Sequence, residues 1–319
     1  MRIGSLKLDN PIFSAPMAGI SDLPYRLIMK RHGAALVFTE MISANGLAFD
    51  GKSTLALLQS RAEEQPLAIQ LFGEHPQRLA EAARRVEEYG QLIDLNLGCP
   101  VRKVVRSGAG SALLQEPAKV ARIIAAVRRA TERPLTMKFR SGWDHDAINY
   151  LEIAHIAVSE GVEALTLHPR TRAQMFGGEA DWRQIKILKE RTPVPVIGSG
   201  DLFDAERIKT MFEQTGCDAV MIGRGGYGHP WIIPQALALL AGKTATKPST
   251  EERFRVAREH LALCLEIFGP RRALNQMRKH LCWYARGMEN AALFRATINQ
   301  SGSMREMSDC LEEFFADAA

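Results

Sequence analysis

The chain has 319 residues, 46% of them hydrophobic, and a formal net charge of +5. This length and apolar content suit one large domain with a smaller one, and they exclude a disordered or low-complexity protein. No apolar stretch is long enough to cross a bilayer, the N-terminus lacks a signal-peptide pattern, and the five cysteines show no CxxC spacing. We therefore expect a cytoplasmic protein with no disulfide framework, no metal site and no membrane association.

Short β-rich apolar runs alternate with amphipathic helical segments up to about residue 240. The expected strands cover 12–16, 36–39, 67–71, 92–96, 135–140, 164–168, 194–198 and 219–222. Eight strand–helix alternations of this length fit a TIM (β/α)₈ barrel, whose typical size is about 250 residues. An open doubly wound sheet is the alternative. It would need a glycine-rich dinucleotide turn after the first strand, and SAPMAGISD is not one.

The β signals stop past residue 250, where helices are expected over 251–268, 272–288, 291–300 and 305–318. The segment AGKTATKPST before them is the expected linker. The sequence thus predicts an α/β protein with a barrel domain over residues 1–242 and a small all-helical domain over 250–319. Nine Lys or Arg residues face three acids between positions 253 and 295. This indicates either a solvated helical face or a phosphate-binding surface.

The interior of such a barrel is packed solid, so chemistry is expected at the C-terminal ends of the strands. The seventh strand ends in Ser199, Gly200 and Asp201, and the eighth ends in Gly223 and Arg224. Loops at these two positions often bind phosphate, because glycines let backbone N–H groups approach and arginine supplies a cation. Either motif alone could be a tight turn, but the two together favour a phosphate site.

Lys138 and Arg140 lie on one face of the fifth strand. Charges that point into a barrel mouth are unfavourable unless they are paired or bind a ligand. An ion pair with Asp94 could account for one of them, and a flavin for the other, because the N1–C2=O edge of a flavin gains negative charge on reduction. Gln70 and His168 could contact the same cofactor, although each could equally be a core residue.

Six segments, in this order and context, resemble the flavin-dependent tRNA-dihydrouridine synthases, and the bacterial B-type branch looks closest. They are SAPMAGISDLPYR, LNLGCPVRKV, AGSALL, MKFRSGW, LHPRTR and VMIGRGGYGHPW. The resemblance covers nearly the whole chain, and LNLGCP followed by GSALL is its most specific part. It implies a barrel with bound FMN and a helical domain that helps to hold tRNA. It also implies reduction of uridine to 5,6-dihydrouridine with NADPH as the electron donor.

Carried over by motif, the resemblance implies that Cys99 is the catalytic acid and that Asn96, Arg140 and Arg170 lie against the target base. The implied FMN contacts are Pro16, Met17, Ala18, Gln70, Lys138, His168, Ser199, Gly200, Asp201, Gly223 and Arg224. Two positions depart from the family pattern, because Pro169 replaces the usual glycine and Ser199 the usual asparagine. We expect the local shape of the cofactor site to differ there.

The reaction explains why a cysteine is needed at this place. The C5=C6 bond of uracil is conjugated to the C4 carbonyl, so a hydride from flavin N5 adds at C6 and C5 must then take a proton. A free cysteine has a pKa of about 8.5, so the Cys99 thiol is mostly protonated near neutral pH and can donate. The nearby Arg102, Lys103 and Arg106 are expected to meet RNA phosphate. The remaining cysteines are expected to be inert.

Two other functions are compatible with parts of the sequence. A flavin barrel that acts on a free pyrimidine or another small molecule would explain the barrel, but it leaves the basic helical segment unexplained. A catalytically silent RNA-binding regulator would leave Cys99, Lys138 and His168 unexplained as a set. No protein partner is predicted.

Overall fold

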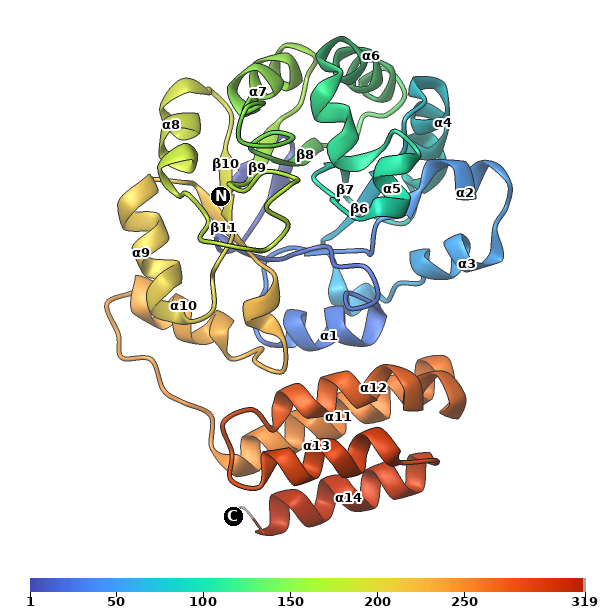
Figure 1. The fold of residues 1–319 in the computed structure, drawn as a ribbon, viewed down its shortest axis with the longest axis vertical. Helices are drawn as coiled ribbons and strands as arrows, with labels where there is room; N and C mark the ends of the chain where they lie inside the picture. Colours follow the sequence, from blue (N-terminus) through green and yellow to red (C-terminus); the bar gives the residue numbers. More distant parts are fainter. Residues whose placement is uncertain (318–319) are drawn as a thin grey trace.

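The structure, a computed structural model that describes residues 1–317, is a barrel of parallel strands with a separate layer of helices beside it (Figure 1). In spatial order the strands are β3 (Ile12–Ser14), β11 (Ala219–Ile222), β10 (Val196–Ser199), β9 (Ala164–His168), β8 (Leu135–Arg140), β7 (Leu92–Leu97), β6 (Leu67–Phe72) and β4 (Val37–Phe38). A parallel bridge between Phe13 and Leu36 closes the circle. The predicted barrel is confirmed, and the strand ends differ from prediction by at most two residues.

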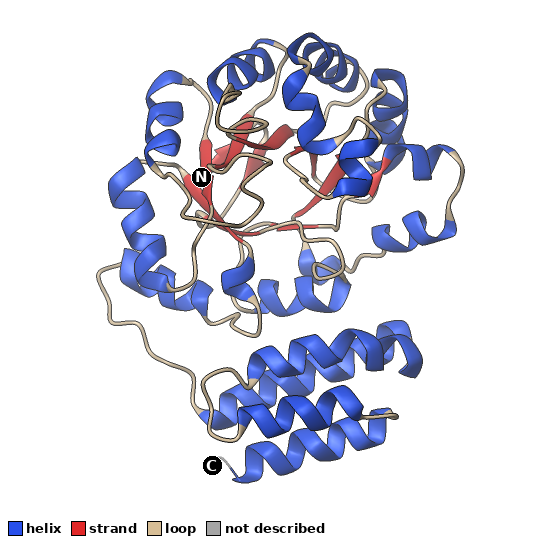
Figure 2. Cartoon of the chain, in the orientation of Figure 1, coloured by secondary structure: helices blue, strands red, loops and turns tan. Residues whose placement is uncertain are grey.

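Helices surround the strands on the outside of the barrel (Figure 2). They are α1 (Leu23–Arg31), α4 (Pro76–Val86), α6 (Pro117–Arg128), α7 (Tyr150–Ser159), α8 (Arg183–Arg191), α9 (Ala205–Thr215) and α10 (Ile232–Leu240). Local sequence explains several of their ends. Pro76 and Pro117 occupy first-turn positions where no N–H is needed. Asp204 caps α9 by accepting from the backbone N–H of Arg207, and Gly216 ends it at φ +64°.

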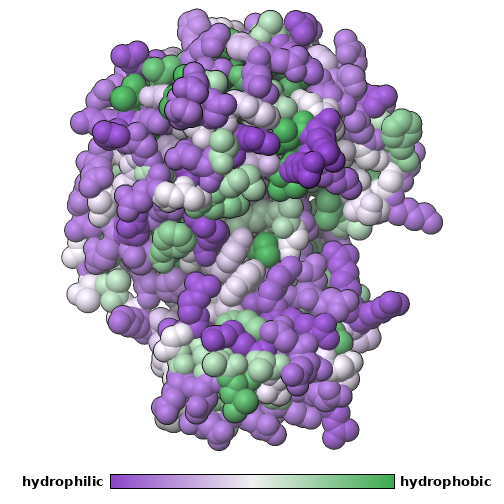
Figure 3. Space-filling view, viewed as in Figure 1, coloured by the Kyte–Doolittle hydropathy of each residue, from purple (hydrophilic) through white to green (hydrophobic). Residues whose placement is uncertain are grey.

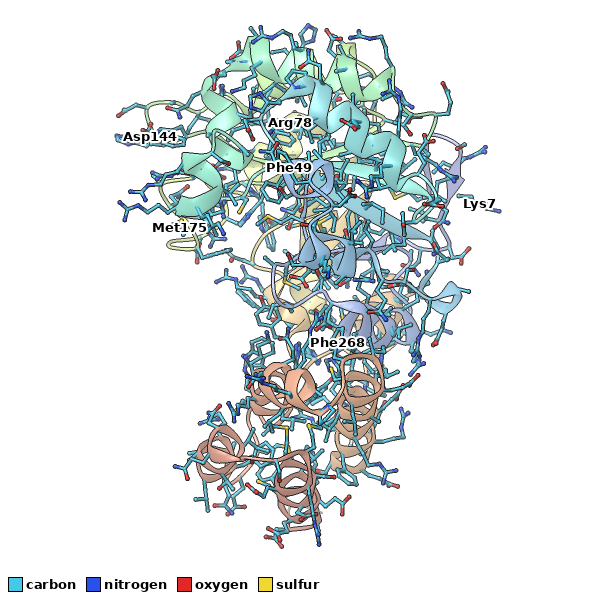
Figure 4. The ribbon with its side chains drawn as sticks, turned by 90° about the vertical axis from the view of Figure 1, so that its right-hand side faces the viewer. Lys7, Phe49, Arg78, Asp144, Met175 and Phe268 are labelled. Atoms are coloured by element: carbon cyan, nitrogen blue, oxygen red, sulfur yellow. The ribbon has the colours of Figure 1, made fainter. Side chains whose placement is uncertain are left out.

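Several short elements were not predicted. They are β1 (Arg2–Ile3), β2 (Leu6–Lys7), β5 (Ile42–Ser43), α2 (Ala44–Ala48), α3 (Lys52–Leu55) and α5 (Arg102–Arg106), with 3₁₀ turns between them. The hairpin of β1 and β2 lies at the N-terminal end of the barrel, where Figure 4 labels Lys7, and Met175 marks the opposite end. Among the residues that the structure describes, no helix is both long and apolar enough to span a bilayer.

The C-terminal helices are α11 (Thr250–Phe268), α12 (Pro270–Tyr284), α13 (Ala291–Gln300) and α14 (Met304–Asp317). Their apolar core contains Met277 and Leu281, and it continues into the barrel through Leu27 of α1 and Trp231 at the start of α10. Figure 1 shows the layer of helices packed below α1. No regular element lies between Leu240 and Thr250. The proposed boundaries at 242 and 250 stay a prediction, because the apolar core is shared across them.

Polar and backbone contacts also join the two parts of the chain. Arg31 of α1 pairs with Glu259 of α11 at 2.5 Å. Gly228, with φ +60°, approaches α12 so closely that a Cβ there would lie 2.4 Å from the carbonyl carbon of Trp283. Only glycine fits this backbone conformation and this spacing. The ring of Trp283 stacks on Tyr227, with 4.2 Å between the ring centroids. The barrel and the helices therefore form a closely fitted pair.

Candidate active site

A cavity of about 310 Å³ opens at the C-terminal ends of the barrel strands, and ligand sites commonly measure about 300–1,000 Å³. Figure 3 shows it as a hollow with apolar side chains around it, on the face viewed in Figure 1. The predicted site residues that line it are Pro16, Met17, Ala18, Gln70, Asn96, Cys99, Lys138, Arg140, His168, Ser199, Gly200, Asp201, Gly223 and Arg224. Arg170 is the one predicted site residue outside this lining.

Several lining residues were not predicted: Met41, Met175, Phe176, Phe203 and Tyr227. Met175 and Phe176 are 43% and 49% exposed on a loop between β9 and α8. Figure 4 shows Met175 projecting from the open end of the barrel. An apolar pair in a polar loop that ends in two glycines was the available signal for them. They give the mouth of the cavity an apolar rim.

The loop after β7 is held in place by the side chain of Asn96. Its Oδ1 accepts hydrogen bonds from the backbone N–H groups of Gly98 (3.1 Å) and Cys99 (2.9 Å). Its Nδ2 donates to Oε1 of Gln70 at 2.7 Å. Asn96 therefore positions the cysteine with its oxygen and reaches the neighbouring strand β6 with its nitrogen.

A second support comes from the 3₁₀ turn Gly110–Gln115, which holds the carbonyl of Cys99. Ser111 donates to this carbonyl from its backbone N–H (3.1 Å) and from its hydroxyl (2.9 Å). Gly110 has φ +60°, and a Cβ there would lie 2.8 Å from the same oxygen. The motif GSALL thus serves to pack a backbone turn directly beneath the cysteine.

The Cys99 thiol is half-buried at the edge of the cavity. Burial raises its pKa above the usual value, and the backbone N–H of Val101 and the charges of Arg140 and Lys138 oppose this only in part. The thiol therefore keeps its proton at neutral pH, as a general acid must. All five cysteines lie within the described residues and are free. Cys217 and Cys264 are buried, and Cys282 and Cys310 are half-buried like Cys99.

The carboxylate of Asp94 does not hold a cation. Gln70 donates to its Oδ2 and Thr136 to its Oδ1, each at 2.6 Å, and burial raises its pKa to about 6. Among the described residues, no ion pair joins it to Lys138. Burial, reinforced by the nearby charge of Arg140, lowers the pKa of Lys138 to about 8. Lys138 is thus an unpaired cation beside the cavity, which an anionic group in the cavity would stabilise.

Arg140 connects two loops at the cavity mouth. Its Nε donates to the carbonyl of Gly98 at 2.9 Å, and its Nη1 donates to the carbonyls of Thr171 (2.9 Å) and Met175 (2.7 Å). Its guanidinium carbon also lies 5.5 Å from the ring centroid of Phe176. Arg140 therefore lines the cavity as predicted, and it also ties the cysteine loop to the loop that carries the apolar rim.

Arg170 lies behind the cavity wall and is fully buried. It donates to the carbonyls of Gly177 (3.1 Å) and Gly178 (2.6 Å) and to Oδ2 of Asp201 (2.7 Å). Its position differs from the expected contact with a base, because its long side chain turns back onto its own loop. Sequence spacing alone places the backbone of Arg170 at the strand end, but it does not fix this direction.

Asp201 balances two arginines. It pairs with Arg170 at 2.7 Å and with Arg224 at 3.3 Å, and it accepts from the backbone N–H of Ala180 at 2.8 Å. Burial alone would raise its pKa, but these donors and charges outweigh burial and hold the pKa below its usual value. The preceding Gly200 has φ +120°, and a Cβ there would lie 2.9 Å from that of Ala180. The SGD turn thus fits only with glycine at its centre.

His168 is neutral in this surrounding. Burial lowers its pKa well below the usual value, and the charges of Lys138, Arg140, Arg170 and Arg224 lower it further. Nη1 of Arg170 lies 3.3 Å from its Nε2. Because a guanidinium can only donate, Nε2 is the acceptor and the ring proton belongs on Nδ1.

The two departures from the family pattern have simple local explanations. The Ser199 hydroxyl donates to the carbonyl of Met221 on the neighbouring strand at 3.2 Å, so its polar atom is satisfied inside the barrel wall. The carbonyl of Pro169 accepts from the backbone N–H of Asp181 at 3.1 Å, which anchors the loop despite the missing donor of proline.

Comparisons with known proteins find the same family over nearly the whole chain. The sequence matches the model of the family described as dihydrouridine synthase (Dus) over residues 13–319. It is 41% identical over 317 residues to "tRNA-dihydrouridine synthase B" of Pasteurella multocida (strain Pm70), covering 99% of this chain and 96% of that protein. It is 37% identical over 318 residues to "Probable tRNA-dihydrouridine synthase" of Rickettsia bellii (strain RML369-C), covering 99% and 98%.

Two solved structures share the barrel architecture at low sequence identity. A 2-naphthoyl-CoA reductase complex superimposes with a TM-score of 0.60 and 13% identity, covering 76% of this chain and 52% of that chain. Histamine dehydrogenase from Rhizobium sp. 4-9 superimposes with a TM-score of 0.57 and 14% identity, covering 76% and 47%. At these identities the likeness concerns the fold alone.

Proposed function

Because the chain belongs to the dihydrouridine synthase family, with its B-type relatives in bacteria, we propose that it reduces uridines in tRNA to 5,6-dihydrouridine, using bound FMN and electrons from NADPH. The protein is an oxidoreductase of that family. One observation supports the proposed reaction most directly: Cys99 and Lys138 line the same cavity, and Lys138 has no ion-pair partner among the described residues. One supplies a retained proton and the other a half-buried positive charge.

The residues around the cavity suit an FMN. Lys138 and the Nδ1–H of His168 would hold the polar edge of the flavin ring, and Gly223 with Arg224 would hold the phosphate. A Cβ at Gly223 would meet only ordinary van der Waals contacts, with Met17 Sδ at 3.8 Å and Ala15 Cβ at 3.9 Å, so this part of the cavity wall is not crowded. Asp201 would act indirectly, because its carboxylate is already used to orient Arg224. These contacts form a cationic donor set suited to an anionic cofactor.

When bound, the flavin would supply a hydride to C6 of uracil. Cys99 would then give its thiol proton to C5, and the reaction needs that proton at an atom held in place. Asn96, near the end of β7, holds the cysteine loop through the backbone N–H of Cys99, and Ser111 holds it through the Cys99 carbonyl. Arg140 adds a third tie through the carbonyl of Gly98. These residues position the acid, and the second N–H of Asn96 remains for the base edge.

Cations near the cavity mouth would hold the RNA backbone. Arg102, Lys103 and Arg106 of α5 are exposed, and none forms an ion pair with another described residue. Figure 3 shows strongly hydrophilic side chains where Figure 1 draws α5, next to the hollow. Arg271 and Arg272 at the start of α12 are also exposed. The two groups belong to the barrel and to the helical layer, so a single RNA could contact both.

Some cations of the basic helical segment are exposed, and others bind to groups within the protein. Arg278 donates to the carbonyl of Ser301 at 2.8 Å, and Lys279 donates to the carbonyl of Gly19 at 2.5 Å. These two are therefore engaged inside the protein, whereas Arg271 and Arg272 remain available to phosphate. The helical segment would thus contribute fewer RNA contacts than its charge count suggests.

The test is an assay of the purified holoprotein with NADPH on unmodified tRNA and on free uridine, followed by mapping of dihydrouridine. We expect yellow protein, reduction of specific uridines in tRNA and no appreciable reduction of free uridine. Equal rates on free uridine would favour an oxidoreductase of small pyrimidines. A colourless protein that binds tRNA without turnover would favour an RNA-binding regulator.

A further inference from the structure

One wall of the cavity is a loop whose far end touches the helical layer. The loop spans residues 15–22 between β3 and α1, and its residues Pro16, Met17 and Ala18 line the cavity. Gly19 follows directly. Its N–H donates to Oε2 of Glu40, which follows β4, and its carbonyl accepts from Nζ of Lys279 on α12 at 2.5 Å. The peptide groups of Gly19 are thus held from the barrel on one side and from the helical layer on the other.

Side-chain packing does not fix this point of the loop. Gly19 has φ +72°, and a Cβ built there would have no heavy atom within 4 Å. The loop next to it is tied together by two hydrogen bonds, because the Ser21 hydroxyl accepts from the backbone N–H of Met17 at 2.9 Å and the N–H of Ser21 donates to the Met17 carbonyl at 2.9 Å. A displacement of Gly19 would therefore carry Met17 with it, and Met17 lines the cavity.

The charges around Lys279 match this arrangement. Burial lowers the pKa of Lys279, while the carboxylates of Asp22 and Glu40 favour its charged form. Asp22 and Glu40 are 4% and 8% exposed, so they are screened little by solvent. Lys279 also donates to Oε1 of Gln276 at 2.7 Å. Its ammonium group is therefore occupied by partners within the protein.

We propose that Lys279 and Glu40 form a latch that fixes Gly19, so that the helical layer sets the cofactor-side wall of the cavity. Lys279 is then a positioning residue for the bound flavin and not an RNA contact. The identity of the ligand rests on the proposed function, but the latch itself rests on the contacts of Gly19. Since Lys279 lies 260 residues beyond Gly19 in the chain, the latch also explains how a distant segment shapes the cavity.

The test measures FMN affinity in the full-length protein by the recovery of flavin fluorescence on dilution of the holoprotein. Lys279→Met keeps the apolar stem and removes the donor, and we expect FMN to bind about tenfold more weakly, with unchanged salt dependence of tRNA binding. Arg305→Met removes an exposed cation from α14, outside the proposed RNA contacts, and should leave FMN affinity unchanged. Glu40→Met removes the acceptor of the Gly19 N–H from the barrel side, so it tests the latch without touching α12, and it should also weaken FMN binding.

The outcomes separate this inference from its alternatives. Additive effects of Lys279→Met and Glu40→Met would contradict a shared latch, because both substitutions release the same glycine. Unchanged FMN affinity with weaker, less salt-dependent tRNA binding in Lys279→Met would overturn the latch and make Lys279 a phosphate contact. If the unsubstituted protein does not bind FMN, both the latch and the proposed function are contradicted. FMN binding that is normal in every variant overturns only the latch.

Discussion

The side-chain oxygen of Asn96 accepts a 2.9 Å hydrogen bond from the backbone N–H of Cys99. The same oxygen also accepts from the backbone N–H of Gly98, so one side chain holds two successive residues of the loop. The position of the proposed proton donor thus depends in part on a neighbour at the same strand end. Placement of a catalytic group matters because misplacement by about 1 Å can cost roughly 100-fold in rate.

Replacement of Cys99 by alanine should remove the proton donor and leave the cavity otherwise unchanged. We expect Cys99→Ala to lower the single-turnover rate of uridine reduction by about 10²- to 10⁴-fold, with FMN and tRNA affinities retained. The measurement is rapid-mixing reduction of tRNA by prereduced enzyme. Cys310→Ala, in the helical layer, is the control and should react like the unsubstituted protein. A rate close to normal in Cys99→Ala would assign the acid to another group.

The charge of Lys138 should make FMN affinity depend on pH. The pKa of this lysine is lowered to about 8 in the protein without a ligand, so the positive charge is present below that value and is lost as pH rises through it. We expect FMN to bind more weakly as the pH rises from 7 to 9, as measured by fluorescence titration. Lys138→Met should bind FMN weakly at both values, and a slope that persists in this variant would point to a different titrating group.

The carboxylate of Asp201 should be important for stability because it neutralises Arg170, which is fully buried. Asp201→Asn would leave that guanidinium without its charge partner, and we expect a loss of about 3 kcal/mol in the free energy of unfolding, measured by urea denaturation. Glu213→Gln is the matched control, because it breaks the exposed 3.8 Å pair with Lys209 and should change stability little. Similar stabilities of the two variants would mean that Arg170 finds another partner.

Helix α5 should contribute to RNA affinity through phosphate contacts. A triple charge-neutral variant, Arg102→Gln with Lys103→Gln and Arg106→Gln, should weaken tRNA binding. It should also reduce the slope of log affinity against log salt by roughly one for each lost contact. Filter binding at several salt concentrations provides the measurement, with Arg305→Gln in exposed α14 as the control. An unchanged slope would exclude α5 from the RNA-binding surface.

Periodicity and composition were sufficient for the barrel because each of its strands is a short segment rich in apolar residues, with most of its side chains buried. The eight strands from β3 to β11 that were predicted are such segments, as in Leu135–Arg140. The elements that were missed are too short to show a period: α2 and α3 have five and four residues, and β1 and β2 have two each. Their stability comes from tertiary contacts that the local sequence does not encode.

At the site, strand-end position was enough to bring together residues that are far apart in sequence, from Pro16 to Arg224. It could not show which polar atoms are already engaged. Arg170 has the right residue type and position, yet its guanidinium bonds to its own loop and to Asp201. Lys279 belongs to a basic run, yet its ammonium reaches Gly19. Long flexible side chains can point in several directions, and only packing selects one.

The close approach at Gly228 limits how such enzymes can be recombined. Any side chain at this position would collide with the backbone of Trp283, 55 residues further along the chain. A chimaera that joins the helices of a relative to this barrel must therefore keep glycine at position 228. It must also keep a helix backbone that approaches this glycine as closely as α12 does. Grafts that alter only one partner should come apart under limited proteolysis, even when each half is folded.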